Sequence, residues 1–259
     1  MTDPTWPYPR WIAHRGAGKL APENTQVAFE LGHRHGFWMF ECDAKLSADG
    51  QVFLLHDDAL DRSTSGRGPA ALRTWAELAG LDAGSWLSPS YAGERLWTLN
   101  ALAAWLQAQR CLVNLEIKPC PGREVETGAT VAAQAQALWA QADTPPLLSS
   151  FSEAALQAAL AAAPDLPRAL LFDVLPPDWL ARAQALQAVA VVPKHVLLDA
   201  AIIGMAHGAG LRVLTYTVND LERAEALFSQ GLDGLITDKV DLFEVQARAE
   251  AALLNRQVP

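Results

Sequence analysis

The stretch Leu147–Phe172, LLSSFSEAALQAALAAAPDLPRALLF, decides the fold. It begins and ends with short apolar runs, Leu147–Phe151 and Arg168–Phe172, which are typical of strands buried on both faces. Between them lies the Ala/Leu-rich run Ser152–Ala163, which opens with Ser-Glu, as helices often do, and stops before Pro164. A strand, a helix and a second strand in series form a βαβ unit, and serial βα units build parallel sheets.

The same alternation extends from this stretch towards both ends of the chain, with no Gly/Ser-rich linker between the units. Further helices are predicted at Asn24–Gly36, Asn219–Gln230 and Val240–Leu254. About eight units in 259 residues favour a single (β/α)8 TIM barrel over an open sheet. No GxGxxG follows the first strand, which argues against a dinucleotide-binding sheet. The other predicted strands are Trp11–His14, Met39–Asp43, Leu112–Ile117, Ala188–Val192, Arg212–Val218 and Gly234–Thr237.

One segment interrupts the alternation. After the second strand, Asp49-Gly50 is a pair of the kind that joins the strands of a hairpin. The following stretch, Asp57–Trp97, is irregular, rich in glycine and proline, and too long for an ordinary loop. Because loops after barrel strands lie on the catalytic face, we expect one domain, 1–259, with an insertion at about 57–97 capping that face.

The composition is that of a globular protein, with 51% hydrophobic and 19% charged residues. Twenty Lys and Arg against 29 Asp and Glu give a net charge of −9, which disfavours nucleic acid and anionic membranes but permits a small anionic substrate. The three cysteines show no CxxC spacing, and the opening MTDPTWPYPR has no apolar signal segment. No run is long enough to cross a bilayer. We therefore expect a cytoplasmic protein without membrane insertion.

Charged groups gather at the predicted C-terminal ends of the first strands, where barrel enzymes carry their chemistry. The tripeptide His14–Gly16, HRG, offers a histidine for proton transfer and an arginine for two phosphate oxygens. Glu41 and Asp43 are two residues apart on a strand and share one face, while Cys42 points away. A divalent cation with oxygen ligands would relieve the repulsion between these two acids.

The third strand repeats this spacing at its end, where Glu116 would complete a three-carboxylate metal site and Lys118 would supply a cation for phosphate. His56 ends the hairpin run that leaves the second strand, on the same face as the acids. Taken singly, these groups have ordinary interpretations as a structural histidine, solvated acids or a weak Glu–Lys pair. Together they indicate metal-assisted hydrolysis of a phosphodiester.

The longer motifs around these residues resemble the glycerophosphodiester phosphodiesterase family, whose barrel is shared with the phosphatidylinositol-specific phospholipases C. The length and the single insertion are similar to those of its small bacterial cytoplasmic members. The motifs run in order over nearly the whole chain: HRGAGKLAPENT (His14–Thr25), FECDAKLSADGQVFLLHDDALDRSTSGRG (Phe40–Gly68), LEIK (Leu115–Lys118), YTVND (Tyr216–Asp220) and GLITD (Gly234–Asp238).

The resemblance implies a role for each charged group. His14 and His56 would be the acid/base pair, with either residue as the acid, and Arg15 and Lys118 would bind the phosphate. The cofactor would be one divalent cation, Mg²⁺ or Ca²⁺ with Mn²⁺ as a further candidate. Its ligands would be the three carboxylates of Glu41, Asp43 and Glu116.

Two positions depart from the family pattern. Tyr216 stands in the expected substrate site where the family usually has Trp, which keeps a ring but changes its size and hydrogen bonding. Trp97 replaces the usual Pro before Thr98. Both departures bear on which alcohol is preferred rather than on the reaction. Glu23, in the PENT segment, has two open interpretations, contact with the site or structural support, and structural support is the one we favour.

The predicted reaction is hydrolysis of a small glycerophosphodiester to glycerol 3-phosphate and an alcohol. Three alternatives stay open at this point. A phospholipase or a sphingomyelinase-D-like enzyme on the same barrel would act on membranes, for which this acidic chain shows no anchor. A barrel that binds without turnover would be expected to lack a histidine or a metal carboxylate. A metal-dependent sugar isomerase would recruit ligands from later strands.

Overall fold

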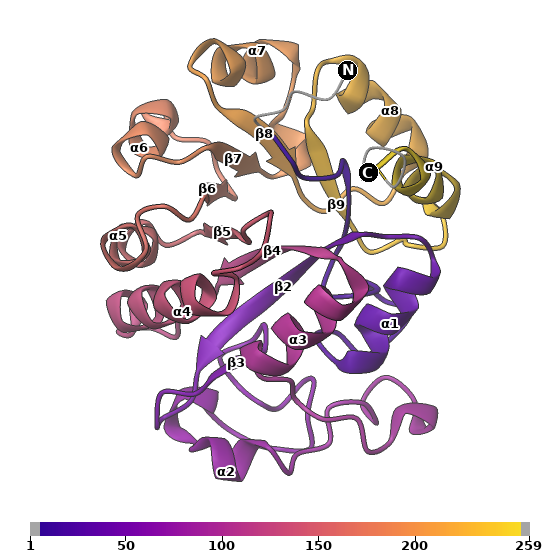
Figure 1. Ribbon diagram of the computed structural model, residues 1–259, viewed down its shortest axis with the longest axis vertical. Coiled ribbons are helices and arrows are strands. Elements are labelled where there is room, and N and C mark those ends of the chain that lie inside the picture. Colours follow the sequence, from indigo (N-terminus) through magenta and orange to yellow (C-terminus); the bar gives the residue numbers. More distant parts are fainter. Residues whose placement is uncertain (1–5, 255–259) are drawn as a thin grey trace.

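The computed structural model describes residues 6–254, so the outermost parts of the predicted domain, 1–5 and 255–259, lie outside the described residues. Within this part, eight parallel strands close into a barrel, which confirms the predicted (β/α)8 fold (Figure 1). The ring closes because β1 (Trp11–Ala13) pairs with both β2 (Met39–Leu46) and β9 (Gly234–Thr237). The strands between β2 and β9 around the ring are β4 (Leu112–Ile117), β5 (Leu147–Ser150), β6 (Arg168–Phe172), β7 (Ala190–Pro193) and β8 (Arg212–Thr215).

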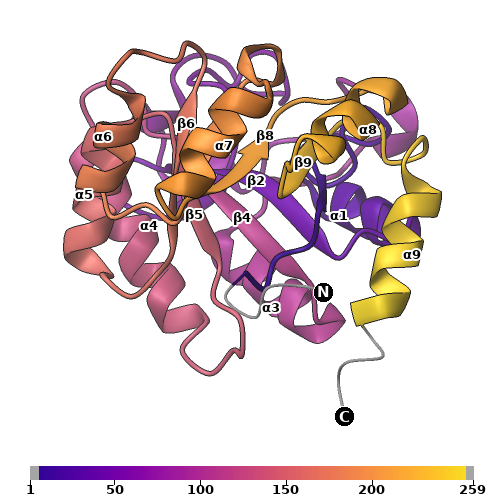
Figure 2. The same cartoon turned by 90° about the horizontal axis from the view of Figure 1, so that it is seen from above.

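Helices pack around the outside of the strands (Figures 1 and 2). The helix predicted from the Ser-Glu pair is present as α5 (Glu153–Ala162), and the Ser152 Oγ caps its N-terminus by accepting a hydrogen bond from the Ala155 N–H at 3.2 Å. The last predicted helix is shorter than expected and begins at Glu244 rather than Val240. The longer helices are α1 (Gln26–Arg34), α3 (Leu99–Gln109), α4 (Glu124–Leu138), α5 (Glu153–Ala162), α6 (Trp179–Ala185), α7 (Ala200–Gly208), α8 (Leu221–Ser229) and α9 (Glu244–Leu254).

Side chains along each strand alternate between the barrel interior and the layer beneath the helices. On β2, Phe40 and Cys42 belong to the outer layer, whereas Met39 belongs to the interior cluster. Glu41 and Asp43 share the interior face with Met39 and lie nearer the C-terminal end of the strand, above this apolar interior. Other members of the interior cluster are Ile12, Leu147, Leu171, Val192, Leu214 and Ile236.

The predicted hairpin after β2 is present, since β3 (Val52–Leu54) pairs antiparallel with the end of β2. The residues that follow, 57–97, form the lower part of Figure 1. They contain three short helices, η1 (Ala70–Leu72), α2 (Trp75–Leu78) and η2 (Pro89–Tyr91). A small apolar cluster of their own holds them together with β3: Phe53, Leu55, Leu60, Ala70, Leu78, Ala83 and Leu96.

Trp97, one of the two departures from the family pattern, packs in the outer layer. Its ring stacks on Phe29 of α1 with the centroids 5.6 Å apart, and Trp105 of α3 lies 6.3 Å away on the same measure. This tryptophan therefore joins α1 to α3.

None of the helices in residues 6–254 has the length and hydropathy that a bilayer crossing requires.

Candidate active site

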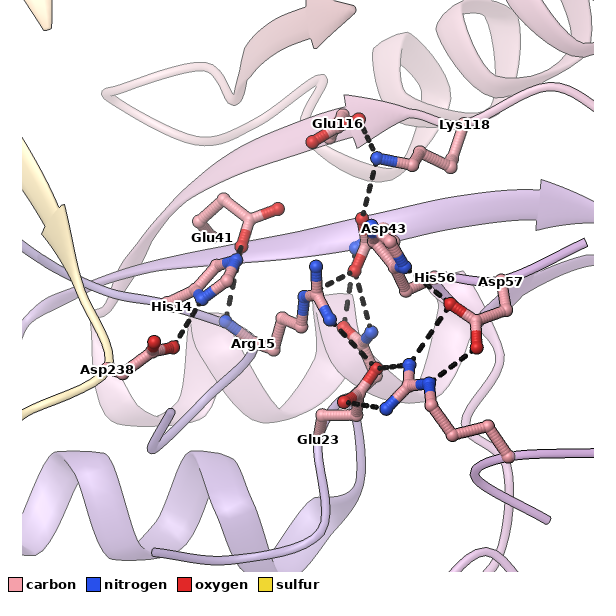
Figure 3. A network of polar contacts seen from close by, with 12 residues as sticks. His14, Arg15, Glu23, Glu41, Asp43, His56, Asp57, Glu116, Lys118 and Asp238 are labelled. Atoms are coloured by element: carbon pink, nitrogen blue, oxygen red, sulfur yellow. Dashed lines mark hydrogen bonds and ion pairs between the residues drawn. The ribbon is translucent and has the colours of Figure 1, made fainter. Parts of the chain in front are cut away.

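Three buried carboxylates meet at the C-terminal ends of two neighbouring strands (Figure 3). Glu41 and Asp43 come from β2 and Glu116 from β4, and the strand register places Asp43 beside Glu116. One oxygen from each of the three residues lies within 4.8 Å of the others. The residues are 2%, 1% and 6% exposed, respectively. The structure thus brings the three predicted metal ligands together.

The charges of this cluster are strongly coupled. Burial, followed by repulsion from Asp43 and Glu116, raises the pKa of Glu41 well above its usual range. Burial and the charge of Asp43 likewise raise the pKa of Glu116, to about 7. Burial also opposes ionisation of Asp43, but the nearby Arg15 and Lys118 outweigh it and lower the pKa of that carboxyl.

These carboxylates fit a hard divalent cation. Glu41 Oε1 and Asp43 Oδ1 are fully buried and have no hydrogen-bond partner among the described residues. Buried carboxylate oxygens are costly to leave unpaired, and closely spaced acids are normally neutralised by a cation. An all-oxygen donor set suits Mg²⁺, Ca²⁺ or Mn²⁺ rather than a softer metal.

Two cationic side chains border the cluster. Arg15 places its Nε 3.2 Å from Asp43 Oδ2 and donates from Nη1 to Glu23 Oε1 at 3.0 Å. Lys118 lies 2.7 Å from Glu116 Oε1 and 3.7 Å from Asp43 Oδ1. Each cation is thus held by carboxylates at the edge of the cluster, where a phosphate would find positive charge.

The loop after β1 is fixed in a conformation that few residues adopt. Arg15 has φ +49° and Gly16 has φ +97°. A Cβ on Gly16 would approach the backbone of Ala28 in α1 to 2.8 Å, so only glycine allows this contact. Further along the loop, Asn24 donates to Asp43 Oδ2 at 2.9 Å. The loop therefore supports both the guanidinium and one of the carboxylates.

His14 contacts an acid that directly follows the last strand of the barrel, β9. Its Nδ1 lies 2.6 Å from Asp238 Oδ1, and its Nε2 lies 3.7 Å from Glu41 Oε2. Asn219 donates to the other Asp238 oxygen at 3.1 Å. Although burial opposes ionisation of Asp238, these hydrogen bonds lower its pKa to about 2. A proton on Nδ1 leaves Nε2 as the nitrogen that faces the carboxylate cluster.

His56 has the same arrangement with an acid of its own. Its Nδ1 lies 2.7 Å from Asp57 Oδ1, and hydrogen bonds from Arg62 are the main reason that the pKa of Asp57 falls to about 2. Burial is the main reason that the pKa of His56 is lowered. Figure 3 shows His14 and His56 flanking the Glu41–Asp43 pair.

Tyr216 lies at the C-terminal end of β8. Its hydroxyl donates to Asp173 Oδ1 at 2.8 Å, with the Phe172 carbonyl at 3.1 Å as a second acceptor. The ring meets Phe151 edge-on at 5.6 Å, and the Phe151 ring in turn lies 5.3 Å from Lys118 Nζ. A row of contacts therefore connects Tyr216 to the cationic border of the cluster.

Four contact residues were given no site role by the sequence argument: Asp238, Asp57, Arg62 and Asn24. An imidazole that moves protons needs a partner on Nδ1, so an acid that directly follows a histidine is a usable signal. The adjacent pair His56-Asp57 offered this signal. For His14, the signal was the acid that directly follows the last predicted strand, because the first and last strands of a closed barrel are neighbours.

Known proteins resemble this chain over most of its length. The model of the family described as "Glycerophosphoryl diester phosphodiesterase family" matches residues 14–242. The protein YhdW of Bacillus subtilis strain 168 is 34% identical over 89% of this chain and 94% of its own length. A glycerophosphodiester phosphodiesterase of Caldanaerobacter subterraneus is 31% identical over 88% of this chain and 93% of its own.

Among solved structures, an Oleispira antarctica phosphodiesterase in complex with the product sn-glycerol-3-phosphate superimposes with a TM-score of 0.84. It is 34% identical in sequence, and the match covers 94% of this chain and 96% of that one. The barrel, the buried acid cluster and these matches lead to one conclusion: the chain belongs to the glycerophosphoryl diester phosphodiesterase family and is an enzyme of that activity.

Proposed function

We propose that this enzyme hydrolyses small glycerophosphodiesters to glycerol 3-phosphate and an alcohol, in a reaction that depends on one divalent cation. The observation that carries the proposal is a cluster of three buried carboxylates, bordered by two cations and flanked by two histidines that each contact an aspartate. The Oleispira antarctica relative, with glycerol 3-phosphate as its product, supports the same product here.

The cation would be held by Glu41, Asp43 and Glu116, and Mg²⁺, Ca²⁺ and Mn²⁺ all match these oxygen donors. When bound, it supplies positive charge that neutralises phosphoryl oxygens. Arg15 and Lys118 bind and orient the phosphate. Because Arg15 carries a planar fork of donors, it can hold two phosphate oxygens at once.

The two histidines move the protons. In-line displacement at phosphorus needs a base that takes a proton from the attacking hydroxyl or water and an acid that gives one to the leaving alkoxide. His14 and His56 flank the cluster in a way that suits these two tasks. Asp238 and Asp57 hold the imidazoles through Nδ1, which leaves Nε2 of each ring for the transfer.

We further propose that residues 57–97 cover the substrate side of the barrel and that Tyr216 contacts the substrate. The insertion reaches the site through its own contacts with His56 and Glu23. The acidic composition and the three free cysteines, all buried, are in keeping with a cytoplasmic enzyme.

The test is release of glycerol 3-phosphate from glycerophosphoethanolamine by the purified protein, before and after treatment with a chelator. We expect turnover that chelation abolishes and that added Mg²⁺, Ca²⁺ or Mn²⁺ restores. Turnover that chelation leaves unchanged would contradict the role of the cation. No release under any condition would contradict the substrate class.

The histidine roles need a second experiment. His14→Ala and His56→Ala should each lower kcat by roughly 100-fold or more in folded protein. A p-nitrophenyl ester needs no general acid, so it should rescue one variant, and the rescued position is the acid. Equal rescue of both variants, or of neither, would contradict the assignment.

A further inference from the structure

The motif LDRSTSGRG (Leu60–Gly68) contains an arginine that the reaction scheme does not use. Arg62 contacts two different carboxylates, each through two of its nitrogen–oxygen contacts. Its Nε lies 2.5 Å from Asp57 Oδ2, and its Nη2 lies 3.1 Å from Asp57 Oδ1. Towards Glu23, Nη1 and Nη2 each donate at 2.7 Å, one to each carboxylate oxygen. One guanidinium thus holds two acids from separate segments of the chain.

Each of these acids also contacts a side chain with a proposed role in the reaction. Asp57 contacts the Nδ1 of His56 at 2.7 Å, and Glu23 accepts a hydrogen bond from the Nη1 of Arg15 at 3.0 Å. The contacts therefore run without a break from the imidazole to the phosphate-binding arginine, and Arg62 is the middle of the series. Arg15 continues it to the metal cluster through Asp43, 3.2 Å away.

We propose that Arg62 is a positioning residue that fixes the His56 imidazole and the Arg15 guanidinium relative to each other. This inference rests on the proposed roles of those two residues. Through Arg62 the insertion takes part in the reaction, because a residue of segment 57–97 sets the geometry of groups on the barrel itself.

The chemistry of the contact explains why arginine is required. Without the guanidinium, Asp57 and Glu23 would face each other as like charges and would turn apart, and each would take its partner with it. A lysine carries a single ammonium and cannot make two planar paired contacts at once. The ring of Trp86, 5.7 Å from the guanidinium carbon, packs on it from the insertion side.

An anchoring role alone would give a different result from positioning. If Arg62 only attached the insertion, its loss would lower stability and leave the kinetic constants of folded enzyme unchanged. If it positions both groups, Arg62→Gln should lower kcat through His56 and raise KM through Arg15. Asp57→Asn should then act mainly on kcat, and Glu23→Gln mainly on KM.

The experiment measures kcat, KM and thermal unfolding for Arg62→Gln, Arg62→Lys and Arg62→Ala with glycerophosphoethanolamine. We expect kcat/KM to fall about 10- to 100-fold for Arg62→Gln, as is common when a group that orients an active-site residue is removed. Arg62→Lys should recover only part of the loss. Free guanidinium ion should raise the kcat/KM of Arg62→Ala severalfold and leave that of the native enzyme unchanged.

Arg73→Gln is the matched control, because Arg73 lies in the same insertion and its ion pair with Glu77, at 3.6 Å, is exposed. It should stay within about twofold of the native enzyme. The double variant of Arg62→Gln with Asp57→Asn should have a kcat little below that of the worse single variant, since the two act through one contact.

Two results would overturn the inference: a folded Arg62→Gln enzyme with native kcat and KM, or losses in kcat that multiply in the double variant. His56→Ala, measured in the same series, separates this failure from failure of the proposed function. If His56→Ala is inactive while Arg62→Gln is native-like, only the role of Arg62 is wrong. If His56→Ala is itself native-like, the proposed acid/base pair is wrong and the role of Arg62 falls with it.

Discussion

Replacing Asp238 by asparagine should damage both the stability and the catalytic rate, and the local hydrogen bonds show why. Asn219 Oδ1 accepts from the Asp238 backbone N–H at 2.9 Å and from Thr237 Oγ1 at 3.1 Å, so its amide nitrogen must point at the side chain of residue 238. On the other side, His14 Nδ1 points at the same carboxylate from 2.6 Å. An asparagine has one acceptor oxygen for two donors. Either the Asn219 amide or the His14 Nδ1–H would therefore face the NH₂ group of the new asparagine.

The size of the stability loss follows from the pKa of Asp238, which is lowered from 3.8 to about 2. This lowering of the pKa stabilises the folded state by roughly 2 kcal/mol at a pH where the carboxyl is ionised. Because the pKa of the folded state is the lower one, this stabilisation is complete above about pH 4 and is lost as the pH falls towards 2. Asp238→Asn should remove this part of the acid dependence.

The expected effect on rate is a fall in kcat of roughly 10- to 100-fold, because His14 loses the group that selects its tautomer and orientation. The assay is glycerol 3-phosphate release, together with urea unfolding at pH 7 and between pH 4 and 2. Asp233→Asn is a matched control, since Asp233 contacts His207 at 2.8 Å at the opposite, N-terminal end of β9. It should lose stability and keep its kcat. An Asp238→Asn enzyme within threefold of the native kcat would refute this reasoning.

Three further predictions concern separate parts of the molecule. Glu116→Gln should weaken Mn²⁺ binding at least tenfold by titration calorimetry, and unchanged affinity would exclude this carboxylate as a ligand. Arg168→Met should lower the free energy of unfolding by roughly 3 kcal/mol or more with native kcat in the folded enzyme, because Arg168 is only 3% exposed and its guanidinium donates to five backbone carbonyls. Tyr216→Phe should change the order of kcat/KM among glycerophosphodiesters of different alcohols. An unchanged order would mean that the hydroxyl plays no part in selecting the alcohol.

The sequence predicted the barrel well because its strands are short apolar runs bounded by charges or turn residues. The ends of the strands were less accurate. Met39–Asp43 was predicted, but β2 continues to Leu46 because Ala44–Leu46 pairs with β3. The predicted strand Arg212–Val218 ends at Thr215, and the next residue, Tyr216, lies at the barrel mouth.

The grouping of the site residues followed from spacing along strands, since Glu41, Asp43 and Glu116 share the interior face by simple alternation. The contact between His14 and Asp238 spans 224 positions and exists only because β1 and β9 are neighbours. Arg62 lies in an irregular segment, where no helical or strand period indicates the direction of a side chain. Local patterns therefore indicated the proposed reacting groups and, beside His56, the acid that contacts it, but not the contacts made by Asp238 and Arg62.

Through the pairing of β1 with β9, the orientation of the imidazole at position 14 depends on the last strand of the barrel. During synthesis, the histidine at position 14 emerges first, and the aspartate that orients it follows more than two hundred residues later. A nascent or truncated chain that has already gathered the three carboxylates would still leave this imidazole free to rotate. With the proton-transfer role proposed for this histidine, phosphodiester hydrolysis should therefore begin only once the ring has closed.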